Sequence, residues 1–229
     1  MPVASDSAAA GVSRSAGSNT SRVQDARLSF RERVTSIAGA GGAILDFGCG
    51  TGTDAAWYAQ RGHRVVAYDV SPGMVEVLKL RCQHDIESRR IALAVGGLDA
   101  MEHALKAGGP VAVIAANFAV LNHVQDLGPL LHQLAAHLLP GGALVGTVLN
   151  PLYRHDMRRS WWWRSAFRTL GAGPIQQNGK VTSYRHFVRA MRRAAGPEFV
   201  VEEVCAARSG TRLGMLDSDF LFVTLRRQP

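Results

Sequence analysis

Three glycines at alternate positions, directly after a short apolar run, constrain the fold of this chain most. Residues 43–54 read AILDFGCGTGTD, with Gly48, Gly50 and Gly52 following the acid Asp46. Glycine permits positive φ angles and places no side chain between the backbone and a ligand. A strand, a glycine turn and a helix start in this order turn free N–H groups toward a bound molecule. The segment therefore predicts an α/β unit that binds a nucleotide-sized ligand.

A second acid stands at the distance expected of such a unit. Residues 63–69 (HRVVAYD) predict another strand, which ends at Asp69, 17 residues beyond Gly52. In nucleotide-binding α/β units a carboxylate about 20 residues after the glycines accepts the ribose hydroxyls. We therefore predict that Asp69 binds a ribose.

Four segments together resemble the class I S-adenosylmethionine (SAM) dependent methyltransferases. Residues 43–54 resemble the family's (V/I)LDxGxGxG motif, and residues 69–74 (DVSPGM) its D-x-S-x-x-M helix entry. Residues 117–124 (NFAVLNHV) are similar to N-F-x-x-L-N-x-V, and residues 138–145 (LLPGGALV) to L-K-P-G-G-x-L. A nicotinamide-binding domain would instead carry G-x-G-x-x-G. The resemblance covers about residues 43–150 and departs at Ala112, where the family often has an acid.

The alternation of strand and helix patterns predicts the fold that this family has. We expect a doubly wound, mostly parallel seven-stranded sheet with helices on both faces and an antiparallel C-terminal strand pair. The predicted strands are 43–47, 65–69, 91–95, 111–116, 143–149, 199–206 and 219–225, and the predicted helices are 27–38, 54–61, 73–84, 100–106 and 127–139. Residues 1–22, rich in Ser, Ala and Gly, predict a disordered arm. Residues 23–229 predict one domain, in which 150–190 form an acceptor-site insertion or lid.

The resemblance implies SAM as cofactor, S-adenosylhomocysteine as product, and no metal. Asp46 is expected to bond the methionine ammonium, and Asn117 to contact the cofactor through its backbone. Either Asp99 reaches the adenine amine or Leu98 covers the adenine face. The full set of predicted cofactor residues is Asp46, Gly48, Cys49, Gly50, Gly52, Asp69, Val70, Leu98, Asp99 and Asn117.

Methyl transfer from a sulfonium needs the nucleophile held near the methyl group and, for many acceptors, removal of a proton. His123 is the candidate proton acceptor, because an ordinary histidine titrates near pH 6.5. Its alternative is a helix-start residue that touches nothing reactive. The candidate acceptor contacts are Asn122, Tyr153, Trp161 and Trp162. The run Asn150 to Tyr153 is similar to N-P-P-Y of adenine and glutamine methyltransferases, but it follows the wrong strand, so we interpret it as a decoy.

Three adjacent tryptophans stand within an arginine-rich stretch, RRSWWWR at 158–164. Successive helix positions differ by about 100°, so the three indoles cannot share one narrow core stripe. At least one should face the acceptor pocket, a lid contact or a membrane surface, and the sequence leaves these alternatives open. The segment is a candidate for binding an acidic amphiphile.

Charge and cysteine content bear on the protein's partners and location. Residues 1–150 hold 12 Lys+Arg and 12 Asp+Glu, whereas residues 151–229 hold 14 and 6, so the net charge of +8 belongs to the last third. Such a surface attracts acidic partners or is simply solvated. The 3 cysteines have no metal-binding or disulfide spacing. No apolar run reaches the roughly 18 residues of a membrane span, and no signal peptide is evident, so a cytoplasmic location is expected.

The sequence therefore predicts methyl transfer from SAM to an oxygen or nitrogen of a small biosynthetic metabolite, acidic or carrier-bound. A nucleic-acid methyltransferase that uses the basic last third is one alternative, although N-P-P-Y is missing where it would belong. A lipid or membrane-surface methyltransferase is another, with peripheral membrane contact through the tryptophans. The acceptor, the methylated atom and the oligomeric state stay open.

Overall fold

The computed structural model describes residues 24–169, 173–179, 181–207 and 214–229. The arm predicted over residues 1–22 lies outside this part of the chain. Within it, a helix over residues 24–38 comes first and begins three residues earlier than the predicted one. No helix in these ranges is both long and apolar enough to cross a membrane.

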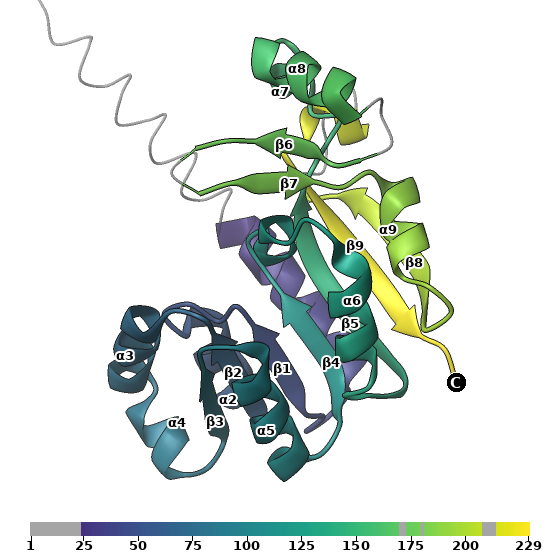
Figure 1. Ribbon diagram of the computed structural model, residues 1–229. Coiled ribbons are helices and arrows are strands. Elements are labelled where there is room, and N and C mark those ends of the chain that lie inside the picture. Colours follow the sequence, from purple (N-terminus) through teal and green to yellow (C-terminus); the bar gives the residue numbers. More distant parts are fainter. Residues whose placement is uncertain (1–23, 170–172, 180, 208–213) are drawn as a thin grey trace, which may run out of the picture.

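A seven-stranded sheet forms the centre of the molecule, in the order β3-β2-β1-β4-β5-β9-β8 (Figure 1). β1, β2, β3, β4 and β5 run parallel to one another, whereas β9 runs antiparallel to both β5 and β8. The strands are β1 (Ile44–Phe47), β2 (Val65–Asp69), β3 (Ile91–Val95), β4 (Val111–Ala116), β5 (Leu138–Leu149), β8 (Phe199–Ala206) and β9 (Phe220–Arg227). The predicted fold class is confirmed.

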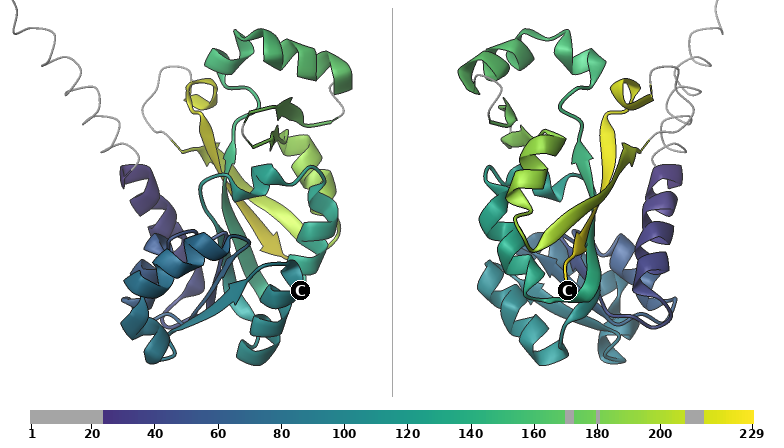
Figure 2. Two further views of the ribbon diagram at one scale, coloured as in Figure 1. Left: turned by 60° about the vertical axis from the view of Figure 1, so that its left-hand side comes forward. Right: turned by 90° about the vertical axis from the view of Figure 1, so that its right-hand side faces the viewer.

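Helices cover both faces of this sheet (Figure 2). One core lies under the 24–38 helix, α2 (Thr53–Ala59) and α3 (Pro72–Arg81), with Phe30, Tyr58 and Leu78 fully buried. The other lies under α5 (Leu98–Gly108), α6 (Leu127–Ala135) and α9 (Val188–Ala194). The remaining helical elements are α4 (Gln83–Glu87), α7 (Arg154–Met157), α8 (Ser160–Thr169), η1 (Val120–His123) and η2 (Gly214–Asp217). The inner parallel strands β1, β2 and β4 are thereby buried from both sides, as their apolar composition requires.

The bounds of β1 and β9 differ from the predicted ones by one or two residues at an end, and those of β5 differ by five residues at its start. β3 is apolar throughout, but it is the edge strand of the sheet, and Ala92 is exposed. β5 begins at Leu138 rather than at Ala143, and α6 is correspondingly shorter than predicted. Leu138 pairs with Val111 and Ala143 with Val113, so the residues between them bulge out of the ladder instead of forming a separate turn.

Between β5 and β8 the chain builds a small unit beyond the carboxyl ends of β4 and β5 (Figure 1). It contains α7, α8 and a hairpin of β6 (Ile175–Gln177) and β7 (Ser183–Arg185). Arg185 is buried and joins three of its parts: its Nη1 lies 2.9 Å from Asp156 Oδ2 and donates to the Asn150 carbonyl, and its Nη2 donates to Gln177 Oε1. A buried arginine with these partners fixes the unit to the end of β5.

Candidate cofactor and active site

The glycine turn joins β1 to α2 at the carboxyl edge of the sheet, and its three glycines have different tasks. Gly48, Gly50 and Gly52 have φ angles of +76°, +52° and +76°. A Cβ on Gly48 would lie 2.5 Å from Val120 Cγ2, and one on Gly52 would lie 2.5 Å from Leu78 Cγ. A Cβ on Gly50 would meet nothing within 4 Å. Gly48 and Gly52 therefore allow close packing, whereas Gly50 leaves open space beside bare backbone.

Asp69 holds this turn in place from the end of β2. Its Oδ2 accepts a hydrogen bond from the Gly50 N–H (2.8 Å), and its Oδ1 accepts one from the Ser71 N–H (2.9 Å). The Gly48 and Cys49 N–H groups both donate to the Tyr68 carbonyl. Each carboxylate oxygen can still accept a further bond. A fixed acceptor thus stands directly beside the open space at Gly50.

Asp46 is a buried acid with one oxygen unpaired. Burial, and then the negative charge of Asp54, raise the pKa of its carboxyl well above the ordinary value. The Ala55 N–H bonds to this carboxyl, but Oδ2 has no hydrogen-bond donor within the described ranges. A buried acceptor without a donor is rare in proteins, and a positively charged amine would satisfy both its hydrogen bonding and its charge. These residues fit the ammonium of a methionine-type cofactor.

A buried polar network that the sequence did not reveal braces the site. Asp54, in the first turn of α2, accepts a bond from Arg31 Nε (2.7 Å) and another from Asn117 Nδ2 (2.9 Å). Thr147 Oγ1 in turn donates to Asn117 Oδ1 (3.2 Å). The side chain of Asn117 is buried in these bonds, and the contact of its backbone with a cofactor stays a prediction. The pairing of Arg31 with Asp54 joins helices 23 residues apart, and no local motif signals it.

The chain leaves β4 through two consecutive residues in the left-handed region. Phe118 and Ala119 have φ angles of +52° and +61°, which cost about 1–3 kcal/mol each for residues with a Cβ. The Phe118 N–H donates to Asn117 Oδ1, and the Ala119 N–H donates to the Thr147 carbonyl. The Arg27 guanidinium lies 4.5 Å from the Phe118 ring centroid. This strained bend directs η1 across the glycine turn, where Val120 packs on Gly48.

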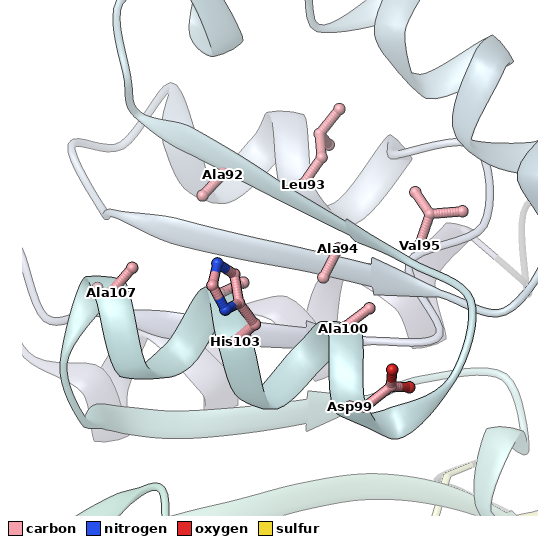
Figure 3. A pocket seen from close by; sticks show the side chains of 10 residues that line it. Ala92, Leu93, Ala94, Val95, Asp99, Ala100, His103 and Ala107 are labelled. Atoms are coloured by element: carbon pink, nitrogen blue, oxygen red, sulfur yellow. The ribbon is translucent and has the colours of Figure 1, made fainter.

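The other predicted cofactor residues lie along the same edge but differ in availability. Val70 follows Asp69 and is 68% exposed. Cys49 is buried, and burial raises the pKa of its thiol, so it stays protonated and acts as a small packing residue. Leu98 packs against the core, which leaves its side chain poorly placed to cover an adenine. Asp99 is exposed in the first turn of α5 and lines an open groove of about 800 Å³ between β3 and α5 (Figure 3).

The predicted acceptor residues separate into exposed and structural ones. His123 is exposed at the end of η1, and Tyr153 is half-buried with its ring 5.1 Å from that of His155. Asn122 is placed differently from the substrate contact predicted for it. Its side chain is fully buried, donates to the Tyr184 carbonyl (2.6 Å) and accepts from the Leu149 N–H (2.9 Å). Asn122 therefore joins η1 to β5 and β7, and its side chain has no exposed surface for an acceptor.

The three tryptophans of α8 have three environments, as their helical spacing predicted. Trp162 is buried, and its Nε1 donates to the Pro151 carbonyl (2.7 Å), so the predicted acceptor contact does not fit its position. Trp161 is half-buried, with its ring centroid 5.5 Å from the Arg185 guanidinium. Trp163 is 48% exposed. Of the three, only Trp161 and Trp163 keep surface for a ligand.

Asn150 behaves as a structural residue, in agreement with its interpretation as a decoy. It follows β5, is buried, and donates from Nδ2 to the carbonyls of Met215 and Ser218. Its Oδ1 accepts from the Leu152 N–H. With both ends of its amide in use, Asn150 cannot present the pair of bonds that recognises a target adenine. No group of three or more His, Cys, Asp or Glu suited to a metal ion occurs in the described segments.

Comparison with known proteins identifies the family. The profile described as "Methyltransferase domain" matches residues 20–197. The ubiquinone biosynthesis O-methyltransferase of Xanthomonas axonopodis pv. citri is 34% identical over 112 residues, which are 48% of this chain and 44% of that one. The magnesium-protoporphyrin O-methyltransferase of Rhodobacter capsulatus is 27% identical over 157 residues, 69% of this chain and 63% of that one. The matches thus span about half the length of these curated relatives.

A solved structure supports the same fold. The S-adenosylmethionine dependent methyltransferase from Mesorhizobium loti superposes with a TM-score of 0.63 at 18% identity, over 88% of this chain and 98% of that one. The chain belongs to the methyltransferase domain family and has the class I, Rossmann-like fold of SAM-dependent methyltransferases.

The raised pKa of Asp46 leads to a paired prediction for Asp46→Asn. In the unfolded chain the carboxyl ionises at its ordinary pKa, so its contribution to stability is lost as the pH rises from that value toward the raised one. An amide removes this penalty and keeps the acceptor for Ala55, but it cannot neutralise an ammonium. At neutral pH, Asp46→Asn should therefore unfold at an equal or higher temperature than the wild type, yet bind SAM more weakly. Thermal unfolding across a pH series and calorimetric titration measure the two effects. A less stable variant with unchanged SAM affinity contradicts the assignment.

Proposed function

We propose that this chain transfers a methyl group from SAM to an oxygen or nitrogen of a small biosynthetic metabolite. The observation that carries the proposal is the pairing of Gly50 with Asp69, which sets a fixed carboxylate beside open space at bare backbone. That arrangement suits a nucleoside, because ribose hydroxyls need charged acceptors and the sugar needs room. When bound, SAM supplies an electrophilic methyl group on a sulfonium.

Different residues around the turn bind different parts of SAM. Asp69 accepts the ribose hydroxyls, Asp46 holds the ammonium, and the exposed side chain of Val70 covers one face of the adenine. Asp99, exposed in the first turn of α5, binds the adenine amine. The side chains of Arg31 and Asn117 do not bind the cofactor themselves, and through Asp54 they keep the start of α2 and the end of β4 in register.

The acceptor enters from the side of η1 and the unit that follows β5. His123 receives the acceptor's proton there, while Tyr153 and Trp161 supply aromatic walls. The two relatives described above are both O-methyltransferases, which favours an oxygen acceptor. The basic surplus of the last third favours an acidic or carrier-bound metabolite. The absence of N-P-P-Y after β4, where residues 117–119 read NFA, argues against an adenine base as the target.

Gly50→Val tests the cofactor assignment against a matched control. The new side chain would fill the open space at the turn, so SAM binding should be lost from a folded protein. Gly39→Val is the control, since Gly39 also has a positive φ (+67°) and also has nothing within 4 Å of its Cβ direction. Both variants put a side chain on a backbone with positive φ, but only Gly50→Val should lose SAM binding in a calorimetric titration. Equal affinities for the two variants would refute the placement of the cofactor.

His123→Ala tests proton removal. General-base catalysis contributes about 10²-fold or more, so turnover should fall by about that factor with a labelled-methyl assay on an active acceptor, while the KM for SAM stays constant. His84→Ala is the control, because His84 is also exposed but lies on α4. Unchanged turnover in His123→Ala would show that His123 is not the proton acceptor and that the enzyme acts by positioning the acceptor alone. A screen of phenolic, carboxylic and carrier-bound acceptors that yields no labelled product would count against the proposed reaction.

A further inference from the structure

The outward face of α8 carries an apolar strip that no described residue covers. Phe167 is 71% exposed and Trp163 is 48% exposed, and their ring centroids are 6.0 Å apart in a tilted arrangement. The opposite side of the helix is anchored, because Trp162 and Ser165 are buried. The two aromatic rings therefore belong to a helix held firmly at its back, and their exposure results from its orientation.

The polar edge of Trp163 is already satisfied within the chain. Its indole Nε1 donates to the Met157 carbonyl (2.8 Å), and Phe167 has no polar atom to pair. Moving both rings into an apolar medium would thus leave no hydrogen-bond donor unpaired. A polar protein partner would find no donor on this strip to recognise. The strip is chemically suited to the region where lipid headgroups meet acyl chains.

Four arginines border the aromatic strip: Arg158, Arg159, Arg164 and Arg168, all exposed. Arg164 and Arg168 each follow one of the aromatic residues, so they lie about 100° around the helix from the ring pair. Residues 157–169 contain no Asp or Glu, and among the described residues none of the four arginines takes part in an ion pair. An apolar strip beside unpaired cations complements a surface that is apolar inside and anionic at its rim.

The position of α8 relates this face to the proposed reaction. The helix lies at the end of the molecule beyond the carboxyl ends of β4 and β5, the sheet edge that also carries the glycine turn, Asp69 and Asn117 (Figures 1 and 2). Trp161 is half-buried on α8, and its ring lies over the Arg185 guanidinium of β7. A surface bound to this face would lie on the same side of the protein as the site.

We propose that α8 docks this protein on anionic phospholipid bilayers, with Trp163 and Phe167 inserted at the interface and Arg164 and Arg168 against lipid phosphates. The docking is peripheral and reversible, and it does not depend on methyl transfer. It extends the proposed function, because an enzyme held in this way receives its acceptor from the bilayer surface. Failure of docking would leave the cofactor site untouched, so the two proposals can be tested separately.

Vesicle flotation of the full chain provides the test. Vesicles of phosphatidylcholine mixed with phosphatidylglycerol should carry the protein to the top of the gradient, and vesicles of phosphatidylcholine alone should carry much less. Replacing both rings (Trp163→Ser with Phe167→Ser) should reduce the partition coefficient at least tenfold. Replacing both arginines (Arg164→Gln with Arg168→Gln) should reduce it roughly fivefold per charge and remove most of its dependence on salt.

Matched controls separate this face from general stickiness and charge. Leu80→Ser removes an 81% exposed apolar side chain from α3, and Arg192→Gln with Arg193→Gln removes two exposed charges from α9. Both controls should float like the wild type. Because the altered side chains on α8 are exposed, its variants should stay folded and keep the wild-type SAM affinity, measured in parallel. The double ring variant loses the Trp163 bond to Met157 and should unfold at a somewhat lower temperature. If the double variant is unstable, Phe167→Ser alone is used in the flotation test, because Phe167 is the more exposed of the two rings.

Two outcomes would overturn the proposal. One is a wild-type protein that stays at the bottom of the gradient with anionic vesicles. The other is flotation that the α8 variants leave unchanged or that the α9 control lowers equally. If the wild type does not bind vesicles but binds an acidic carrier protein through Trp163, Arg164, Phe167 and Arg168, the face is a protein-docking surface and the lipid assignment is wrong.

Discussion

The hydrogen bond from the Gly50 N–H to the Asp69 carboxylate is the contact on which the site depends. It joins the turn after β1 to the end of β2, so it fixes two segments that α2 separates in the sequence relative to each other. A bond of this kind to a charged acceptor contributes about 1.5–3 kcal/mol. The bond holds the turn open where Gly50 has no neighbour, while Gly48 and Gly52 are pressed against Val120 and Leu78. The space for a cofactor therefore exists because Gly48 and Gly52 are tightly packed, whereas Gly50 between them has no neighbour.

Buried charge gives the same edge of the sheet its chemical character. Asp54 lies close enough to Asp46 to disfavour ionisation of the Asp46 carboxyl, but only Asp54 has an arginine partner. The protein thus keeps one acid neutralised by Arg31 and leaves the other short of a cation. Such an arrangement weakens the cofactor-free fold and favours a positively charged ligand, a common compromise at functional sites.

Local signals in the sequence were enough for most of the sheet and for the turn. β2, β3, β4 and β8 have the predicted bounds, because apolar runs and the glycines and acids that flank them are short-range features. Contacts between distant segments were not predictable in this way. The pairing of Arg31 with Asp54, the burial of Asn122 and the edge position of β3 all depend on which elements become neighbours. Trp162 is a similar case, since helical spacing separates three indoles without saying which one faces inward.

Calorimetric titration of the wild-type protein with SAM and with S-adenosylhomocysteine tests the central claim most directly. The site described above predicts saturable one-to-one binding of both, with micromolar affinity, and no binding of a nicotinamide dinucleotide at the same concentration. The affinity for SAM should also increase with pH as Asp46 ionises. A folded protein that binds neither compound, or that prefers the dinucleotide, would contradict the assignment of the glycine turn and Asp69 to a SAM site.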